Sequence, residues 1–582
     1  MQPVDYTTLI ASCSELCAKW LPARLEQVYQ RDRFTIAIAL RTLKKRGWLD
    51  ISWHPQGARI CISDPPPRAP DTFTFSQQLR HQLGGLALIA IVEVSPWERV
   101  LDFQFAKRPG EAPLWHLYVE VMTKYSNVIL TTADNLVVTC AHQVNSQQSS
   151  LRQIQTGQPY ELPPSLTNPI PSLQETQQQW QERISLIPGV LWRNLIKNYR
   201  GLSKALVQPM IEASGLDSQQ STNDLSASDW QKLFKSWQEW LKNLEHSKFD
   251  PGWTANGYTV TGWLSVESVD TVQELLNDYY TGQLNQQEFT QLYHQISQKL
   301  KNITAKLQLK ADTFTERLDQ SDGAELLRSQ ADLLMANLHE WQPGMKAITL
   351  CDFETGEPMV IKLDPEKNAV QNAQSLYKKH QKLKRARLAV EPLLAVVQGE
   401  IDYLEQVEAF LSQLDIYQTP EDLRTLEEIR DELIQQAYLK APEHHHQDNK
   451  KDTEFYRYET PGGFELLVGR NNRQNDLLTF RVAGDYDLWF HTQEIPGSHV
   501  LLRLDAGAKP DEVDLQFVAD ISAFYSRARQ SEIVPVIYTK PKFVYKPKGA
   551  KPGMVVYKQE QVFWGKPQRA ETHIAQLIGV QN

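Results

Sequence analysis

Apolar residues follow a helical period through the middle of the chain. From Phe289 to Leu318 they recur at steps of three or four, at positions 289, 292, 296, 300, 303, 307, 311, 314 and 318. This spacing places an apolar stripe along one face of a helix. Similar runs cover residues 324–341 and 369–411. The pattern therefore predicts three helices, of which the first and the third are long.

The segment between the second and third of these helices predicts a small β-hairpin. Its sequence, KAITLCDFETGEPMVIKLDP, has two strand-like runs with Thr355 and Gly356 at the turn. Two long helices separated by a β tip are typical of an antiparallel coiled coil. We therefore expect residues 285–440 to form a coiled-coil arm, which a helix over residues 421–436 closes.

Toward the N-terminus the pattern changes to short apolar runs separated by turn residues. RLEQVYQ, ARICIS, IAIVEVS, RVLDFQF, NVILTT and NLVVTCAHQV have the length and the β-branched content of strands. Helical segments are expected near residues 6–21 and 75–84. Residues 1–175 are thus predicted to form a β-rich domain with a few helices.

Residues 176–284 are predicted to form a helical domain. Two short amphipathic segments between residues 185 and 216 meet at Gly201, which is typical of a helix-hairpin-helix. The turn of such a motif can offer backbone N–H groups to a phosphate. The same sequence also fits a packed helical hairpin without a ligand, so both interpretations stay open.

A polar segment, PEHHHQDNKKDTE, precedes the last part of the chain, and we expect residues 441–453 to be a linker. Three successive His cannot all face one ion from a regular backbone, so no metal site is expected there. Strands on both sides of a helix at residues 511–529 predict an α/β domain over residues 454–582. The fold class is therefore α+β with several domains, since 582 residues exceed one core.

Composition excludes several classes of protein. No run approaches the roughly 18 apolar residues of a membrane span, and the N-terminus lacks a charged region before an apolar stretch. We expect a cytoplasmic protein without a membrane partner. The five cysteines are scattered and form no CxxC pair, which argues against a zinc ribbon and a disulfide framework. No cofactor is expected.

Charge is distributed unevenly. The net charge is −9, but between Arg527 and Arg569 ten Lys or Arg stand against two Glu. Lysines alternate with aromatic residues in this segment, a combination that suits RNA phosphates and bases. Its Pro-Lys repeats also fit the alternative that they stiffen strand edges and discourage edge pairing. A second basic run, YKKHQKLKRARL at residues 377–388, fits either a solvated helix face or a rail for RNA phosphates.

Hydrogen-bonding side chains are concentrated in GRNNRQNDLLTF (469–480) and DLWFHTQEIPGSHV (487–500). A buried polar group without a partner costs about 1 to 3 kcal/mol, so we expect a surface that touches something polar. Asn475, Asp476 and Ser498 fit the capping of turns as an alternative. His491 and His499 would suit a metal or proton transfer, but no paired carboxylate accompanies them.

Together with VYKPKGAKPGMVVY (544–557), these motifs resemble the NFACT family, bacterial RqcH type. HLYVEVMTKYSNVILTTADNLVV (116–138) and LRHQLGG (79–85) are similar to the family's first domain. The resemblance implies an N-terminal domain with a DNA-glycosylase-like fold, a helix-hairpin-helix, a long antiparallel coiled coil and a C-terminal RNA-binding domain. It implies RNA contacts by the following residues: Arg470, Asn471, Gln474, Asn475, Asp476, Trp489, His491, His499, Lys546, Lys548 and Lys551.

Members of this family act in ribosome-associated quality control. The resemblance implies that this protein binds, through rRNA, a large ribosomal subunit that holds stalled peptidyl-tRNA. It would recruit a tRNA, expected to be alanyl-tRNA, so that untemplated alanine tails mark the nascent chain for degradation. Because the ribosome makes the bond, the protein is expected to be a positioning factor and not an enzyme.

The resemblance also implies tRNA contacts in the first domain. The family's Asp-Arg pair corresponds to Glu98 and Arg99 in SPWERVLDFQF, and its early Asp corresponds to Asp5. Glu98 stands where the family has Asp, and Tyr6 stands where it usually has Gly, which puts tailing activity in question. Without a tRNA role, Glu98 and Arg99 would form a surface ion pair worth about 0 to 1 kcal/mol.

Three other functions stand as alternatives. One is a protein that binds the large subunit or RNA without tailing. A second is a DNA glycosylase, but Met1-Gln2-Pro3-Val4 does not supply the N-terminal Pro and the adjacent Glu of those enzymes. A third is a fibronectin-binding surface adhesin, for which the sequence has no secretion signal and no anchor.

Overall fold

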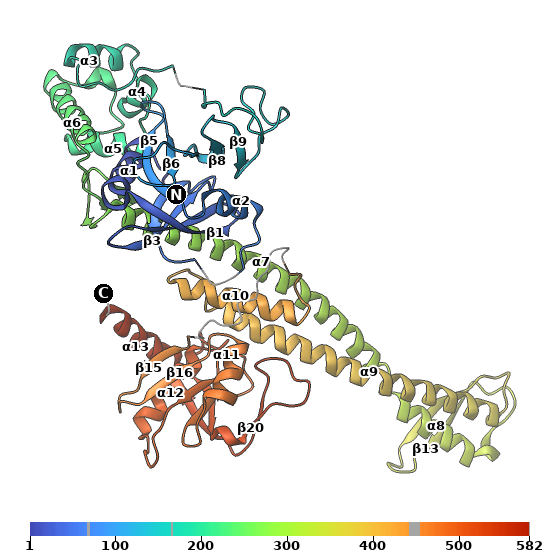
Figure 1. The fold of residues 1–582 in the computed structure, drawn as a ribbon. Coiled ribbons are helices and arrows are strands. Elements are labelled where there is room, and N and C mark those ends of the chain that lie inside the picture. The colour runs from blue at the N-terminus through green and yellow to red at the C-terminus, as the bar shows by residue number, and fades with distance from the viewer. Residues whose placement is uncertain (67–69, 165–166, 442–453, 581–582) are drawn as a thin grey trace. The chain divides into compact units, whose positions relative to one another are not determined.

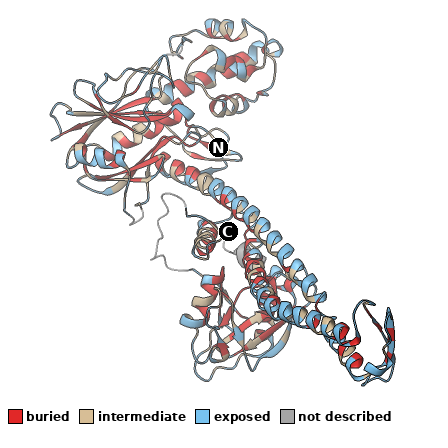
Figure 2. Cartoon of the chain, turned by 90° about the vertical axis from the view of Figure 1, so that its right-hand side faces the viewer, coloured by how far each residue is buried: buried red, intermediate tan, exposed pale blue. Residues whose placement is uncertain are grey.

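The computed structural model describes residues 1–66, 70–164, 167–441 and 454–580, with side chains to residue 574. The chain divides into two compact units, Met1–Asn285 and Gln286–Asn582. Figure 1 labels elements of both units, and Figure 2 shows that buried residues are concentrated on the sheets. Of the expected linker over residues 441–453, residues 442–453 with the three His lie outside the described residues.

A nine-stranded antiparallel sheet dominates the first unit (Figure 1), in the order β4-β3-β2-β1-β5-β6-β7-β8-β9. The sheet consists of two meanders that meet where β1 pairs with β5. The strands are β1 (Ala23–Asp32), β2 (Thr35–Arg41), β3 (Arg46–Ser52), β4 (Arg59–Ser63), β5 (Ala87–Glu93), β6 (Val100–Ala106), β7 (Trp115–Glu120), β8 (Asn127–Thr132) and β9 (Val137–Cys140). The strands expected in this region are confirmed, and β2, β3 and β7 are additional.

Two helices help to form the core of this sheet, α1 (Tyr6–Trp20) and α2 (Thr74–Leu83). Leu9 and Leu16 of α1 lie in one apolar cluster with Phe103 and Phe105 of β6. Their burial places α1 against the sheet. Asp5, the N-cap of α1, therefore also lies beside the sheet. Both helices begin and end within a residue or two of the expected positions.

Four helices form a second core within the first unit: α3 (Gln177–Ser185), α4 (Leu191–Asn198), α5 (Lys204–Ala213) and α6 (Ala227–Glu245). Four indoles, of Trp180, Trp230, Trp237 and Trp240, are buried in it. The ring centroids of Trp237 and Trp240 lie 5.1 Å apart. A small sheet of β10 (Gly252–Thr254), β11 (Gly257–Thr259) and β12 (Glu267–Ser268) follows.

Two long helices, α7 (Val272–Asp319) from Gln286 onward and α9 (Ala369–Leu411), form the arm of the second unit. Phe289 of α7 lies in one apolar cluster with Tyr403 and Val407 of α9, whereas Ala311 clusters with Val397. Early residues of α7 thus meet late residues of α9, so the two helices run antiparallel. The predicted helices are confirmed, and their supercoiling as a coiled coil stays a prediction.

The far end of the arm holds α8 (Ala324–Ala336) and a hairpin of β13 (Ala347–Cys351) and β14 (Pro358–Lys362), as the sequence pattern predicts. Figure 1 shows this tip beside the ends of α7 and α9. The helix α10 (Pro420–Gln435) closes the other end, where Leu426 and Ile429 join the cluster that contains Phe289.

A six-stranded antiparallel sheet forms the last part of the second unit, in the order β15-β16-β18-β17-β19-β22. Its strands are β15 (Tyr456–Glu459), β16 (Glu465–Val468), β17 (Leu488–Thr492), β18 (Val500–Leu502), β19 (Val534–Thr539) and β22 (Gln561–Gly565). The helix α12 (Glu512–Phe524) packs on this sheet, α13 (Pro567–Val580) packs on α12, and β20 (Val544–Tyr545) pairs with β21 (Val556–Tyr557).

The expectation of a mixed α+β protein with several parts is confirmed. A glycosylase-like fold for the N-terminal part stays a prediction. Among the helices in the described ranges, none has the length and apolar character that crossing a membrane requires.

Candidate nucleic-acid interface

The GRNNRQND motif begins where β16 ends and continues into the short helix α11 (Asn472–Leu477). Asn471 is the N-cap of this helix, because its Oδ1 accepts a hydrogen bond of 2.8 Å from the backbone N–H of Gln474. Gly469 leaves room for the turn, since a Cβ there would lie 2.2 Å from Oδ1 of Asn475. The motif is therefore a tightly packed strand-to-helix connection.

Arg470 faces α10 and not solvent. Its Nη2 donates to Oδ1 of Asp422 at 2.8 Å, and the two side chains are only 6 % and 12 % exposed. The guanidinium also lies 4.3 Å from the ring centroid of Tyr456, a cation–π contact. These contacts and its burial keep the guanidinium away from the solvent-exposed surface.

Two more carboxylates of α10 receive the amides of the same motif. Asn471 and Gln474 donate to Oε2 of Glu428 at 2.7 and 2.8 Å. Asn472 donates to Oε1 of Glu432 at 3.1 Å, and Tyr403 donates to the same oxygen at 2.6 Å. Burial raises the pKa of Glu432 above its ordinary value, and these hydrogen bonds oppose the effect.

Asn475 and Asp476 also have partners within the domain. Asn475 is fully buried, and its Oδ1 accepts from the backbone N–H of His499 at 3.0 Å. Asp476 accepts from the backbone N–H of Gly553 at 3.2 Å and forms an ion pair with Lys546. Both side chains fasten neighbouring loops, in agreement with the alternative that they cap turns.

Trp489 and His491 of β17 pack around His499, the residue before β18. Trp489 donates from Nε1 to Thr479 at 3.0 Å, and the Thr479 hydroxyl lies 2.7 Å from Nδ1 of His499. The rings of His491 and His499 have centroids 5.4 Å apart. Burial lowers the pKa of His491 to about 4 and that of His499 well below its ordinary value, so both rings are neutral near pH 7.

We predicted that this motif lines an RNA-facing surface, but the structure places most of its side chains in the interior. Arg470, Asn471, Gln474, Asn475, Trp489 and His499 are all buried. Their hydrogen-bonding groups do touch something polar, as the composition indicates, but the partners are α10 and the domain's own loops. As direct RNA contacts these residues stay a prediction. No group of three or more His, Cys, Asp or Glu that suits a metal occurs within the described ranges.

The lysines of the segment after β19 have mixed surroundings. Lys546 and Lys548 are exposed, as are Lys540 and Lys542. Lys551 instead lies between two tyrosines of the arm, 5.1 Å from the ring centroid of Tyr403 and 4.5 Å from that of Tyr438. It donates to the Tyr438 hydroxyl at 2.8 Å, so its charge helps to hold this loop against the arm.

Three exposed residues of α11 and the turn after it were not among the predicted contacts. Arg473, Phe480 and Arg481 lie at the surface and help to line a cavity of about 330 Å³. The segment 478–482 is a π-helical turn, a geometry that is frequent at functional sites. Positions 473, 477, 480 and 481 share one helix face, a spacing that was visible in the sequence.

The predicted tRNA contacts of the first domain lie around the turn between α4 and α5. Asp5 is buried and caps α1 by accepting from the backbone N–H of Thr8 at 2.8 Å. Its other oxygen accepts from the hydroxyl of Ser203, which itself caps α5 through the backbone N–H of Leu206. One carboxylate therefore ties two helix N-termini together.

Glu98 and Arg99 take different partners. Glu98 pairs with Arg200, the residue before Gly201, at 3.3 Å. Arg99 donates from Nη1 to the backbone oxygen of Val4 at 3.1 Å. Burial lowers the pKa of Arg99, while the charges of Asp5 and Glu98 raise it. In place of the surface ion pair considered between Glu98 and Arg99, Glu98 contacts the helical hairpin and Arg99 contacts the segment before α1.

The turn itself is packed against aromatic side chains. Gly201 has a φ of +79°, and a Cβ there would lie 2.6 Å from the Trp97 ring. Trp97 stacks on Tyr6 with centroids 4.5 Å apart. The structure thus brings Asp5 and Glu98, which are distant in sequence, to the helical hairpin, and Arg99 contacts Val4, the residue before Asp5.

Comparisons with known proteins agree along the chain. A family model described as "NFACT N-terminal and middle domains" matches residues 5–453, and one described as "NFACT protein RNA binding domain" matches residues 454–559. "Rqc2 homolog RqcH" of Bacillus subtilis (strain 168) is 29 % identical over 572 residues, which are 95 % of this chain and 96 % of that protein. The protein of the same name from Streptococcus suis (strain 05ZYH33) is 28 % identical over 94 % of this chain and 95 % of its own length.

A solved structure also matches the chain. It is the C-terminal part of the fibronectin/fibrinogen-binding protein from Streptococcus suis, at 29 % identity and a TM-score of 0.38. The match covers 49 % of this chain and 98 % of that structure.

Proposed function

Because the chain belongs to the NFACT family, we propose that it is a ribosome-associated quality control factor that binds RNA of the large subunit. The two family models together match residues 5–559, and the second is described as RNA binding. The relatives named RqcH match over nearly their whole length. A role on ribosomes would place the protein in the cytoplasm.

The observation that carries this proposal is an exposed basic and aromatic surface on the C-terminal domain. Lys540, Lys542 and Lys548 project from the segment after β19, and Tyr545 is 47 % exposed beside them. Lysines neutralise phosphates and aromatic rings stack on bases, so the combination suits unpaired or looped RNA. Arg473 and Arg481 add cations, and Phe480 a further exposed ring, on the surface of the same domain.

The buried GRNNRQND motif would support this exposed surface by holding the loop that carries its lysines. Asn472 donates to Glu432 of α10, and a Cβ at Gly553 would meet its Oδ1 at 2.2 Å. Asp476 holds Lys546 and the backbone of Gly553. These contacts hold the loop that carries Lys546, Lys548 and Lys551 against the arm. The exposed lysines of this loop therefore keep a fixed spacing before RNA binds. Such preorganisation lowers the entropy that binding would otherwise cost.

The finer proposal is that the protein recruits a tRNA, with alanyl-tRNA the expected species, to a subunit that holds stalled peptidyl-tRNA. Asp5, Glu98 and Arg99 would contact this tRNA beside the turn of the helical hairpin. The ribosome would form the peptide bonds of an alanine tail. The protein would contribute by holding two reactants in place, which converts a bimolecular encounter into a local one.

A second candidate is a subunit-binding protein that makes no tail. It is favoured by the internal partners of the predicted tRNA contacts: Asp5 accepts from Ser203, and Glu98 pairs with Arg200. A tRNA would have to compete with these partners or bind beside them.

The experiment that separates these functions is RNA crosslinking and sequencing from cells, together with sedimentation of the tagged protein. Asp5→Asn is the informative variant, because an amide oxygen still caps α1 while the charge beside Arg99 is removed. Recovery of large-subunit rRNA and one enriched tRNA, with the tRNA absent in Asp5→Asn, would support tRNA recruitment. Recovery of rRNA alone would support the second candidate. Absence from large subunits under stalling conditions would refute both.

A further inference from the structure

The hairpin that joins β2 to β3 is strongly basic. Its sequence from residue 41 to residue 46 is RTLKKR, with four cations and no acid. Lys44, Lys45 and Arg46 are all exposed, and Leu43 at the tip is fully exposed. The tip of this hairpin therefore presents several cations to solvent, which suits an anionic partner.

The turn of this hairpin is fixed by one hydroxyl. Thr42 Oγ1 accepts from the backbone N–H groups of Lys44 and Lys45, at 3.2 and 3.0 Å. The backbone N–H of Thr42 donates to the carbonyl of Lys45 at 2.9 Å. The two lysines therefore start from a defined backbone, which reduces the entropy that a bound ligand would have to remove.

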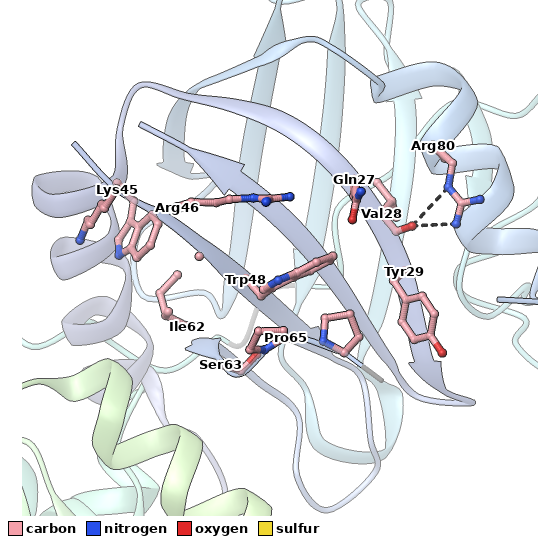
Figure 3. A pocket seen from close by; sticks show the side chains of 13 residues that line it. Gln27, Val28, Tyr29, Lys45, Arg46, Trp48, Ile62, Ser63, Pro65 and Arg80 are labelled. Carbon is pink, nitrogen blue, oxygen red and sulfur yellow. Dashed lines mark hydrogen bonds between the residues drawn. The ribbon is translucent and has the colours of Figure 1, made fainter. Parts of the chain in front are cut away.

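A cavity of about 1070 Å³ lies beside the hairpin, on the part of the sheet formed by β1, β3 and β4. Figure 3 shows Trp48 in its middle, with the Arg46 side chain extended above it and Tyr29 to one side. Trp48 and Tyr29 are both half-buried, so each presents part of its ring to the cavity. Trp20 also lines it, and Gly47 permits this, because a Cβ at Gly47 would lie 2.3 Å from the Trp20 ring.

Cations stand at both ends of this cavity (Figure 3). At one end Lys45 lies 3.9 Å from the ring centroid of Trp20, and Arg46 pairs with Glu26 at 2.7 Å. At the other end Arg80 donates to the backbone oxygen of Val28 at 2.8 Å. Arg80 also pairs with Asp71 at 3.2 Å, so Trp48 and Tyr29 lie between the strongly basic hairpin and an end where a carboxylate offsets the charge of the arginine.

We propose that this face of the first unit binds single-stranded RNA, with an unstacked base against Trp48 and phosphates along Lys44, Lys45 and Arg46. Aromatic rings accept any base by stacking, and neighbouring cations follow the backbone. The cavity is larger than the roughly 300 Å³ of a small ligand site, which leaves room for more than one nucleotide. The inference rests on the proposed function only in taking RNA as the ligand.

The first test compares two charge reversals in the full chain. Lys44→Glu/Lys45→Glu changes the hairpin, and Lys107→Glu/Arg108→Glu changes the exposed loop between β6 and β7 by the same amount. Both are made in a background carrying Lys540→Glu, Lys542→Glu and Lys548→Glu, which weakens the C-terminal surface. The probe is a short fluorescein-labelled single-stranded RNA. The hairpin variant should bind about tenfold more weakly at low salt, and the loop variant should not change.

The second test locates the RNA by ultraviolet crosslinking and mass spectrometry of the peptides. Nucleotide adducts are expected on the peptide that contains Trp48, and Trp48→Phe, which keeps an aromatic ring, should bind far more RNA than Trp48→Ala. Equal affinities of the two charge reversals, or adducts confined to the C-terminal domain, would overturn the inference. The inference would also be overturned if the hairpin variant bound the RNA normally and instead lost binding to an acidic protein. Sedimentation of the unaltered chain tests the proposed function separately.

Discussion

Arg470 donates to Asp422 at 2.8 Å across 48 residues of chain, and both side chains are nearly excluded from water. This pair joins the C-terminal domain to α10. Glu428 and Glu432 extend the same contact along the helix, where they receive three amide donors from the domain. The motif that first suggested a ligand is thus a clasp between two parts of one unit.

Arg470→Ala is expected to loosen this clasp strongly. Removal of Arg470 leaves the buried Asp422 carboxylate without its cation, at a cost of up to about 3 kcal/mol. Hydrogen–deuterium exchange of the α10 peptides should show the loss of protection. The matched control is Arg457→Ala, because Arg457 pairs with Glu465 at the surface, with side chains 66 % and 45 % exposed. That variant should cost at most about 1 kcal/mol. Equal protection of α10 in both variants would contradict the clasp.

Glu432→Gln should change how the stability of this contact depends on pH. Burial raises the folded-state pKa of Glu432, so the group favours folding below its unfolded pKa of about 4.3 and this contribution is lost as pH rises through the folded pKa. Gln carries no charge, so the variant does not pay the free-energy cost of burying an ionised carboxylate at neutral pH. Exchange protection of α10 at pH 7 should therefore be equal or higher in the variant, and the difference should shrink toward pH 4. Lower protection at pH 7 would mean that the carboxylate charge stabilises the contact.

His491→Phe should reduce the acid sensitivity of the C-terminal domain. The folded-state pKa of His491 is lowered to about 4, below an unfolded value of about 6.5. Its contribution to stability is therefore complete above pH 6.5 and is lost as pH falls toward 4, by about 3 kcal/mol at most. Phenylalanine keeps the ring and removes the titration. Thermal unfolding between pH 4.5 and 7 should show a flatter dependence in the variant, and an unchanged dependence would refute this assignment.

Asp5→Ala should destabilise the first unit more than the loss of an ordinary cap. Asp5 caps α1 and also holds the hydroxyl that caps α5, so about 1 kcal/mol is at stake at each helix. Ser226→Ala is the control, because Ser226 caps only α6 in the same unit. Thermal unfolding should rank the variants as unaltered chain, Ser226→Ala and Asp5→Ala, in falling stability. The reverse order would show that the bridge to Ser203 has no energetic weight.

Lys540, Lys542 and Lys548 should contribute to the salt dependence of RNA binding. Removing one lysine–phosphate interaction lowers the steepness of log K against log salt by roughly 0.7 to 0.9. Lys540→Glu/Lys542→Glu/Lys548→Glu should therefore flatten the slope by about two units or more. Lys509→Glu, an exposed change in the same domain, should leave it unchanged. Equal slopes would place the main RNA-binding surface elsewhere.

Regular periodicity made the arm predictable. The spacing of Phe289, Ile296 and Leu300 indicates one apolar helix face, and these residues are buried in the structure. The strand β2 was missed because Thr35–Arg41 is buried on both faces except at its last residue, so it shows no polar alternation. Local pattern therefore identified elements whose two faces differ and overlooked one that is covered on both.

The site was predictable in its chemistry but not in its partners. The density of Asn, Gln and Arg in GRNNRQND correctly indicated many hydrogen bonds. Composition does not tell whether the acceptors belong to RNA or to the same chain, and here they are Asp422, Glu428 and Glu432. These acceptors precede the motif by 40 to 48 residues, beyond the reach of any local pattern.

The clasp on α10 also bears on how the protein can be divided for expression. The family description places a boundary between residues 453 and 454, yet a fragment that starts there would expose Asn472 and Gln474 without their acceptors and would strip Lys551 of Tyr403 and Tyr438. A boundary in the alignment is therefore not a boundary of folding. A fragment that begins at Gln286, where the second unit starts, keeps these interactions and also the contacts of α9 with Phe289 and Ile296 of α7, so it is the piece of the chain with which the RNA surface can be studied alone.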